Sequence, residues 1–144
     1  MKLNIAVFFG GESVEHEVSI ISAHQAIEAL DKNKYNVIPV YVSKERKLYV
    51  SDLLKDMSNY KDLKHLISQC TQVSITSEDN RVVIRPVKPS LFGPKELGTI
   101  DVAIPVMHGT NGEDGTIQGF FEMLKVPYAG CDLYGAAIGQ DKVL

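Results

Sequence analysis

Near its amino terminus the chain has the sequence Leu3-Asn4-Ile5-Ala6-Val7-Phe8-Phe9-Gly10-Gly11. A nearly continuous apolar run that ends in a glycine pair is typical of a strand buried on both faces. Such strands belong to parallel sheets, whose faces are covered by helices. The stretch therefore predicts the first strand of an α/β domain.

The segment that follows has the pattern of a helix and then of a second strand. Apolar residues recur at helical spacing at Ile20, Ala23, Ile27 and Leu30. Residues 35–42 are again rich in apolar side chains, so the order strand, helix, strand predicts a βαβ unit with a right-handed crossover. Because proline cannot donate to a sheet ladder, Pro39 is expected where this strand leaves the sheet.

The same alternation returns later in the chain. Residues 101–107 predict another buried strand, and Pro105 is expected to mark its departure from the sheet. An amphipathic helix should follow, with its apolar face at Ile117, Phe120, Phe121 and Leu124. Together these elements predict an α/β fold with a Rossmann-like parallel sheet and helices on both faces.

Residues 44–99 have a different pattern, and we expect them to form an insertion on the side of the main sheet. A short strand at 47–50 and one or two small helices between 53 and 67 should come first. Two alternating segments, 73–76 and 82–85, predict a hairpin with a five-residue loop. The prolines and glycines that follow indicate a long irregular return.

Composition excludes several classes of function. The chain has 144 residues, which suits one domain, and its formal net charge of −3 offers no basic field for nucleic acid. No apolar run approaches the ~18 residues of a membrane span. Cys70 and Cys131 fit neither a zinc site nor a disulfide scaffold. We therefore expect a cytoplasmic protein with no nucleic-acid or membrane partner.

The loop after the first strand carries the first candidate site. Ligands of open parallel sheets bind beyond the carboxyl ends of the strands. This loop holds three carboxylates, which oppose a phosphate and favour a cationic ligand such as an ammonium group: Glu12, Glu15 and Glu17. A tight turn capped by Ser13 with solvated glutamates explains the same residues, and the sequence alone does not choose between these interpretations.

The loop after the strand at 101–107 carries the second candidate site and should lie at the same edge of the sheet. His108 can donate to an anionic oxygen, and the glycines after it allow the backbone to approach a ligand. A single histidine after a strand also fits a structural role. His24 and His65 fall in helical segments and are expected at the surface.

Three motifs together resemble a known family. They are FGGESVEHEVS at 9–19, HGTNGEDGTIQG at 108–119 and PYAGC at 127–131, followed by Asp141-Lys142. They are similar to the N-terminal (pre-ATP-grasp) domain of D-alanine–D-alanine ligases, and ligases that join D-alanine to D-lactate or D-serine share them. The resemblance runs the whole length, although residues 44–99 match only loosely.

The resemblance implies an ATP-dependent ligase of peptidoglycan precursor synthesis, with Mg²⁺ and an acyl-phosphate intermediate. Glu15 would hold the ammonium group of the first D-alanine, and Val18 would pack near that substrate. His108 would lie near its carboxyl group, Gly109 would line the same pocket, and Lys142 would approach the ATP phosphates. The catalytic residues would be Glu15 and His108, no metal ligand falls within 1–144, and the family implies a homodimer.

The family pattern is incomplete in this sequence. Residues 141–144 fall in an expected helix with no glycine or proline stop, which predicts that the chain is cut. Residues 1–144 would then be the N-terminal substrate-binding domain, inactive by itself, and the ATP-grasp and C-terminal regions would be absent. Two alternatives stay open: a D-Ala–D-Lac or D-Ala–D-Ser ligase, and a non-catalytic Rossmann-like binding module.

Overall fold

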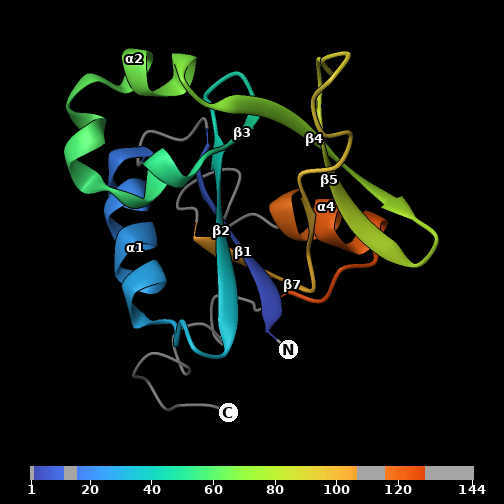
Figure 1. The fold of residues 1–144 in the computed structure, drawn as a ribbon. Helices are drawn as coiled ribbons and strands as arrows, with labels where there is room; N and C mark the ends of the chain where they lie inside the picture. Colours follow the sequence, from blue (N-terminus) through green and yellow to red (C-terminus); the bar gives the residue numbers. More distant parts are fainter. Residues whose placement is uncertain (1, 12–15, 107–115, 129–144) are drawn as a thin grey trace, which may run out of the picture.

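The structure is a computed structural model that describes residues 2–11, 16–106 and 116–128 (Figure 1). Within these ranges the strands are β1 Leu3–Gly10, β2 Tyr35–Val42, β3 Leu48–Val50, β4 Thr71–Glu78, β5 Arg81–Pro86, β6 Gly98–Thr99 and β7 Val102–Val106. The helices are α1 His16–Ala29, α2 Leu63–Ser68 and α4 Thr116–Leu124, with the 3-10 helices η1 Asp52–Lys55 and η2 Met57–Asp62.

The strands form one mixed sheet in the order β6-β5-β4-β3-β2-β1-β7. β1 lies between β2 and β7 and is parallel to both, which confirms the predicted parallel core of the fold. The remaining neighbours, from β2–β3 to β5–β6, are antiparallel. The predicted strands at 3–9, 35–42 and 101–107 are therefore the three parallel strands.

Helices cover both faces of the sheet, as the sequence predicts. Figure 1 shows α1 and the η1–α2 segment on one side of the sheet and α4 on the other. Successive β1 residues point to opposite faces: Val7 and Phe9 pack in the α1 core, whereas Phe8 meets Phe121 of α4 with ring centroids 4.8 Å apart. Burial on both faces explains why β1 is apolar at nearly every position.

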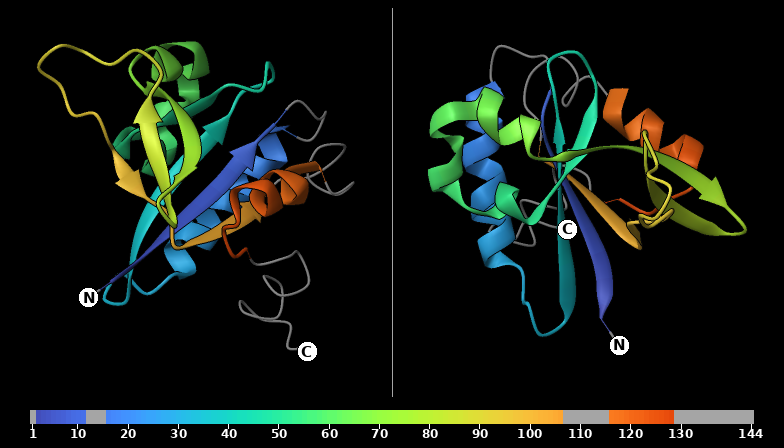
Figure 2. Two further views of the ribbon diagram at one scale, coloured as in Figure 1. Left: turned by 90° about the vertical axis from the view of Figure 1, so that its right-hand side faces the viewer. Right: turned by 45° about the horizontal axis from the view of Figure 1, so that its top comes forward.

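The prediction that residues 44–99 sit beside the main sheet is wrong in one respect, because β3–β6 extend that sheet. The helices of this block also join the core of the α1 face, through the buried Leu54 and Leu66. Residues 87–97 project away from the sheet (Figure 2, left). The block thus widens the domain rather than forming an appendage.

The β4–β5 hairpin is tighter than predicted. The ladder continues from Val73↔Pro86 to Glu78↔Arg81, so only Asp79 and Asn80 form the turn, in place of a five-residue loop. Both have positive φ, 50° and 65°, as a type I′ turn requires. Asp and Asn tolerate this conformation better than other non-glycine residues, which explains why no glycine is needed.

The two prolines lie inside their strands, contrary to expectation. Pro39 pairs with Val7 at a point where β3 does not reach, since β3 pairs with β2 only from Val40 onward. In β7, the N–H of Ala103 points away from β1 and donates to Pro127, so the nitrogen of Pro105, two residues later, lies on that outer side. Proline is compatible with such edge positions.

His24 is buried rather than exposed, whereas His65 is exposed as expected. The Nδ1 of His24 donates to the Ile20 carbonyl, 2.9 Å away. The ring of His24 meets Tyr60 edge-on, with centroids 5.0 Å apart. The helical periodicity placed this residue on α1 but did not reveal that η2 covers it. His24 therefore joins α1 to the inserted block.

Candidate functional site

The carboxyl ends of β1, β2 and β7 form one rim of the sheet. Phe9 pairs with Val106, and Gly10 pairs with Val42, so the three strands end at the same level. The segments 12–15 and 107–115 follow directly from β1 and β7. The loops that contain Glu15 and His108 therefore start from adjacent strand ends, as the sequence predicts.

The glycine pair fixes the end of β1 against β2. The Gly11 N–H donates to the Val42 carbonyl over 2.7 Å. Gly10 and Gly11 have φ of +98° and +95°, and a Cβ on Gly10 would lie less than 3.0 Å from that same carbonyl oxygen. A side chain at Gly10 would thus clash with backbone as well as strain its own conformation.

Neither glycine N–H is available to a phosphate. The Gly10 N–H donates to Ser19 Oγ at 2.8 Å, and the Gly11 N–H is occupied by Val42. A phosphate-binding loop needs such groups pointing at the ligand. The glycine pair therefore supplies no backbone donor for an anion.

Ser19 is a feature of the rim that the sequence analysis did not identify. It lies in the first turn of α1, is 0% exposed, accepts from Gly10 N–H and donates to the carbonyl of Val106. One hydroxyl thus connects β1, α1 and β7. The signal in the sequence was a serine on the same helix face as Ala23 and Ile27, but its second partner lies 87 positions away.

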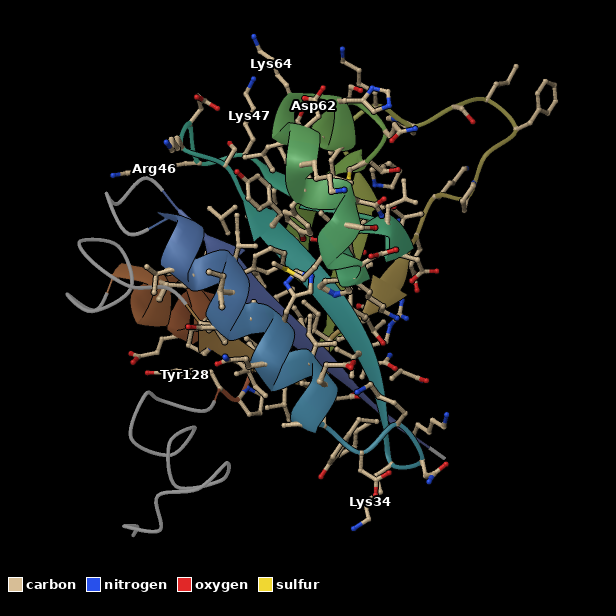
Figure 3. The ribbon with its side chains drawn as sticks, turned by 90° about the vertical axis from the view of Figure 1, so that its left-hand side faces the viewer. Lys34, Arg46, Lys47, Asp62, Lys64 and Tyr128 are labelled. Atoms are coloured by element: carbon tan, nitrogen blue, oxygen red, sulfur yellow. The ribbon has the colours of Figure 1, made fainter. Side chains whose placement is uncertain are left out.

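Positive charge lies beside this rim. The turn between β2 and β3 follows the carboxyl end of β2 and carries the exposed Arg46 and Lys47 (Figure 3). Arg46 has a positive φ of 68°, and the Arg46 N–H donates to Ser43. The turn therefore places cationic side chains at the end of the sheet where β1 ends.

The strongest pKa shift among the described acids lies elsewhere. Two hydrogen bonds from Arg85, of 2.7 and 2.5 Å, together with one from Thr76, lower the pKa of Glu78 to about 2. Arg85 also donates to the Lys95 carbonyl. These groups hold the base of the projecting segment 87–97 and are structural rather than part of the rim.

Of the predicted site residues, only Val18 is among the described residues. Its side chain is 49% exposed, whereas the next residue of α1, Ser19, is buried. Glu15, His108, Gly109 and Lys142 lie outside the described residues. Within the described ranges there is no group of three His, Cys, Asp or Glu side chains that would hold a metal ion.

Residues 4–131 match the family described as "D-ala D-ala ligase N-terminus". The chain belongs to the D-alanine–D-alanine ligase family. It is 41% identical over 143 residues to the D-alanine–D-alanine ligase of Thermosipho melanesiensis and 42% identical over 143 residues to that of Thermosipho africanus. Each alignment covers 99% of this chain but only 38% and 37% of those proteins.

Solved ligase structures have the same fold. The D-alanine–D-alanine ligase of Coxiella burnetii superimposes with a TM-score of 0.73 at 29% identity, over 97% of this chain and 39% of that one. The VanG D-Ala:D-Ser ligase of Enterococcus faecalis gives a TM-score of 0.67 at 30% identity, over 92% and 37%. The chain thus spans less than two-fifths of the length of these relatives.

The described ranges include no helix that is long and apolar enough to cross a membrane. A hollow lies along the second half of α1, away from the rim. Its volume is about 600 Å³, and it is lined by Ile21, His24, Gln25, Glu28, Ala29 and Met57. The rim of β1, β2 and β7 therefore remains the candidate site of this family member.

Proposed function

We propose that this chain is the N-terminal part of a ligase that joins two D-alanines into D-alanyl-D-alanine for peptidoglycan precursors. The observation that carries the proposal is the family match over residues 4–131. The in-register pairing of β1 with β7 supports it, because that pairing starts the Glu15 and His108 loops from neighbouring strand ends. Residues 1–144 would bind the first D-alanine.

The proposed roles follow the charges of the substrate. Glu15 holds the ammonium group of the first D-alanine by a charge-assisted hydrogen bond, Val18 packs beside it, and Gly109 lines the pocket. His108 donates to the carboxyl oxygens, where negative charge must be stabilised while ATP phosphorylates them. The amine of the second D-alanine then attacks this acyl phosphate and releases phosphate.

The nucleotide and the metal need further residues. Lys142 is proposed to approach the ATP phosphates, but an ATP-grasp region and a C-terminal region would supply most contacts to ATP and Mg²⁺. The glycine pair supports this division for the phosphates, because both of its N–H groups are bonded within the chain. We place the complete protein in the cytoplasm.

The identity of the second substrate is the part of the proposal for which the comparisons suggest an alternative to D-alanine. The 30% identity to the D-Ala:D-Ser ligase structure is nearly the same as the 29% identity to the D-alanine–D-alanine ligase structure. The 41–42% identity to ligases named for D-alanine favours D-alanine. D-lactate is the third candidate, and a non-catalytic Rossmann-like module is the alternative outside enzymes.

The test is an assay of the complete protein that contains this chain. It should release ADP and phosphate only when ATP, Mg²⁺ and D-alanine are present, and mass spectrometry should identify D-alanyl-D-alanine. Parallel reactions with D-serine or D-lactate as second substrate measure the preference. Absence of any ligation product would support the binding module instead.

We also propose a homodimer. The apolar side chains of α4 and the segment after it mostly belong to the core, and only Met123 is largely exposed among Phe120, Phe121, Met123, Leu124 and Tyr128. The exposed apolar side chains Ile21 and Met57 instead line the hollow along α1. This surface is the better candidate for the contact between subunits.

A further inference from the structure

Ser19 joins three elements at the rim through one buried hydroxyl. Its Oγ accepts a 2.8 Å hydrogen bond from the Gly10 N–H at the end of β1 and donates to the Val106 carbonyl at the end of β7. Ser19 itself belongs to the first turn of α1. The described pairing of β1 with β7 ends at Phe9↔Val106, so the hydroxyl connects the strands at the last described step of their ladder.

Packing alone does not require a serine here. Ser19 lies on the same helix face as Ala23 and Ala26, which are 0% and 1% exposed and bring α1 close to the sheet. Alanine at position 19 would pack against the sheet in the same way and would favour the helix more than serine does. A buried hydroxyl is retained at this point because it has two backbone partners, one on each strand.

Both partners lie next to the proposed catalytic loops. Val106 is two positions before His108, and Gly10 begins the glycine pair before the loop that contains Glu15. Ser19 is also one helical turn after Glu15 in the sequence. Any shift of α1 or β7 relative to β1 therefore changes where both loops start.

We propose that Ser19 is a positioning residue for the first D-alanine, which it affects by fixing the ends of β1 and β7 against the start of α1. This inference rests on the proposed function. Ser19 does not touch the substrate; it sets the distance between the segments that carry Glu15 and His108. Its loss should therefore weaken binding of the first D-alanine more than binding of ATP.

The experiment compares three variants of the complete protein. Ser19→Ala removes both hydrogen bonds, Ser19→Thr keeps the hydroxyl, and Ala26→Gly weakens α1 away from the rim. We expect Ser19→Ala to raise KM for the first D-alanine about tenfold, since a misplacement of ~1 Å can cost ~100-fold. KM for ATP should change less than about twofold, and Ser19→Thr should restore most of the D-alanine affinity.

Ala26→Gly separates positioning from stability. It should lower the unfolding midpoint, because glycine in a helix is less stable than alanine, yet leave KM for D-alanine unchanged. Equal KM values for Ser19→Ala and Ala26→Gly would overturn the inference. If Ser19→Ala does not fold, Ser19→Cys, a weaker donor of similar shape, is compared with the same control.

A double-mutant cycle with Glu15→Gln completes the test. If Ser19 acts by placing Glu15, the two substitutions together should raise KM by less than the product of their separate effects. Strictly multiplicative effects would contradict the inference even if the ligase activity is confirmed. Failure of the proposed function has a different signature, because the unaltered protein would then form no dipeptide.

Discussion

Gly10 is expected to be the least replaceable residue of the rim. Gly10→Ala would place a Cβ against the Val42 carbonyl at a positive φ of 98°, so we expect a loss of about 1–3 kcal/mol in the free energy of unfolding. Urea denaturation monitored by circular dichroism measures this loss. The matched control is Gly119→Ala, because Gly119 lies in α4 with no atom within 4 Å of its added Cβ.

The control substitution should change the free energy of unfolding in the opposite direction. Alanine replaces glycine in an exposed helix position, so Gly119→Ala should raise stability by about 0.5–1 kcal/mol. A Gly10→Ala protein as stable as the Gly119→Ala protein would show that the end of β1 adapts to a side chain.

Glu15 should be distinguished from its neighbour Glu12 by kinetics. Glu15→Gln keeps the shape and removes the charge that pairs with the ammonium group, a bond that contributes roughly 1.5–3 kcal/mol. KM for the first D-alanine should therefore rise about 10–100-fold in the complete protein. Glu12→Gln, which removes an equal charge from the same loop, should have little effect. The reverse result would assign the ammonium group to Glu12.

The Glu78–Arg85 pair of the β4–β5 hairpin should make the stability of the fold depend on pH in the acidic range. Arg85 holds the pKa of Glu78 at about 2, below the usual ~4.3 of a glutamate in the unfolded chain. The ion pair thus stabilises the fold fully above pH ~4.3, and this contribution is lost as the pH falls towards 2. The unfolding midpoint measured from pH 6 to pH 2 should decline more steeply than in Glu78→Gln.

Glu45→Gln is the control for that measurement, since Glu45 is an exposed carboxylate in the turn between β2 and β3. The unfolding midpoint of this control should change with pH in the same way as that of the unaltered protein. Identical slopes for the unaltered protein and Glu78→Gln would mean that solvent screens the Arg85–Glu78 pair almost completely, as happens with many surface ion pairs.

The elements that sequence patterns predict best are those whose periodicity is set by burial. β1, β2, β7, α1 and α4 all lie where the apolar patterns place them, because each buries a continuous run or a helical face. Which strands pair with one another is harder to predict than where the strands and helices lie in the sequence. The positions of Pro39 and Pro105 depend on which neighbouring strand reaches them. The β4–β5 hairpin has a local pattern, but its attachment to the main sheet depends on the pairing of β3 with β2 and β4, which no local pattern encodes.

In the candidate site too, features set by local patterns were predictable and contacts between distant residues were not. The rim was predictable, because carboxyl ends of parallel strands meet at one edge. The contribution of Ser19 was not, because its carbonyl partner Val106 lies 87 positions away and belongs to the backbone, which leaves no trace in residue type. The burial of His24 was missed for a similar reason: η2, which covers it, arrives from the inserted block.

The molecule as a whole is expected to need the rest of its sequence for activity. The isolated chain 1–144 should hydrolyse no ATP and form no dipeptide, because the proposed phosphate and metal contacts lie mostly in other regions. Phosphate release measured with and without D-alanine checks this. Sustained ATP hydrolysis by the purified chain would contradict the division of the site between regions.

Association should depend on the α1 surface. Ile21→Glu places a charge among the exposed apolar side chains around the hollow, so it should shift the complete protein from dimer to monomer in light scattering. Met123→Glu is the control, since Met123 is 83% exposed on α4, which covers the other face of the sheet. A dimer broken by Met123→Glu and not by Ile21→Glu would place the contact on α4.

The order of strands in the sheet also has a consequence for synthesis on the ribosome. β2 to β6 pair with their neighbours in sequence, and a tight hairpin such as β4–β5 closes in ~1–10 μs. β1 must wait for β7, since Asn4 and Asp101, which share a hydrogen bond at the start of this pairing, are 97 positions apart. At ~5–20 residues per second, that separation corresponds to roughly 5–20 s of translation. During this interval a nascent chain presents one edge of β1 with unpaired N–H and C=O groups. The rim proposed to bind substrate therefore cannot form until β7 has been synthesised.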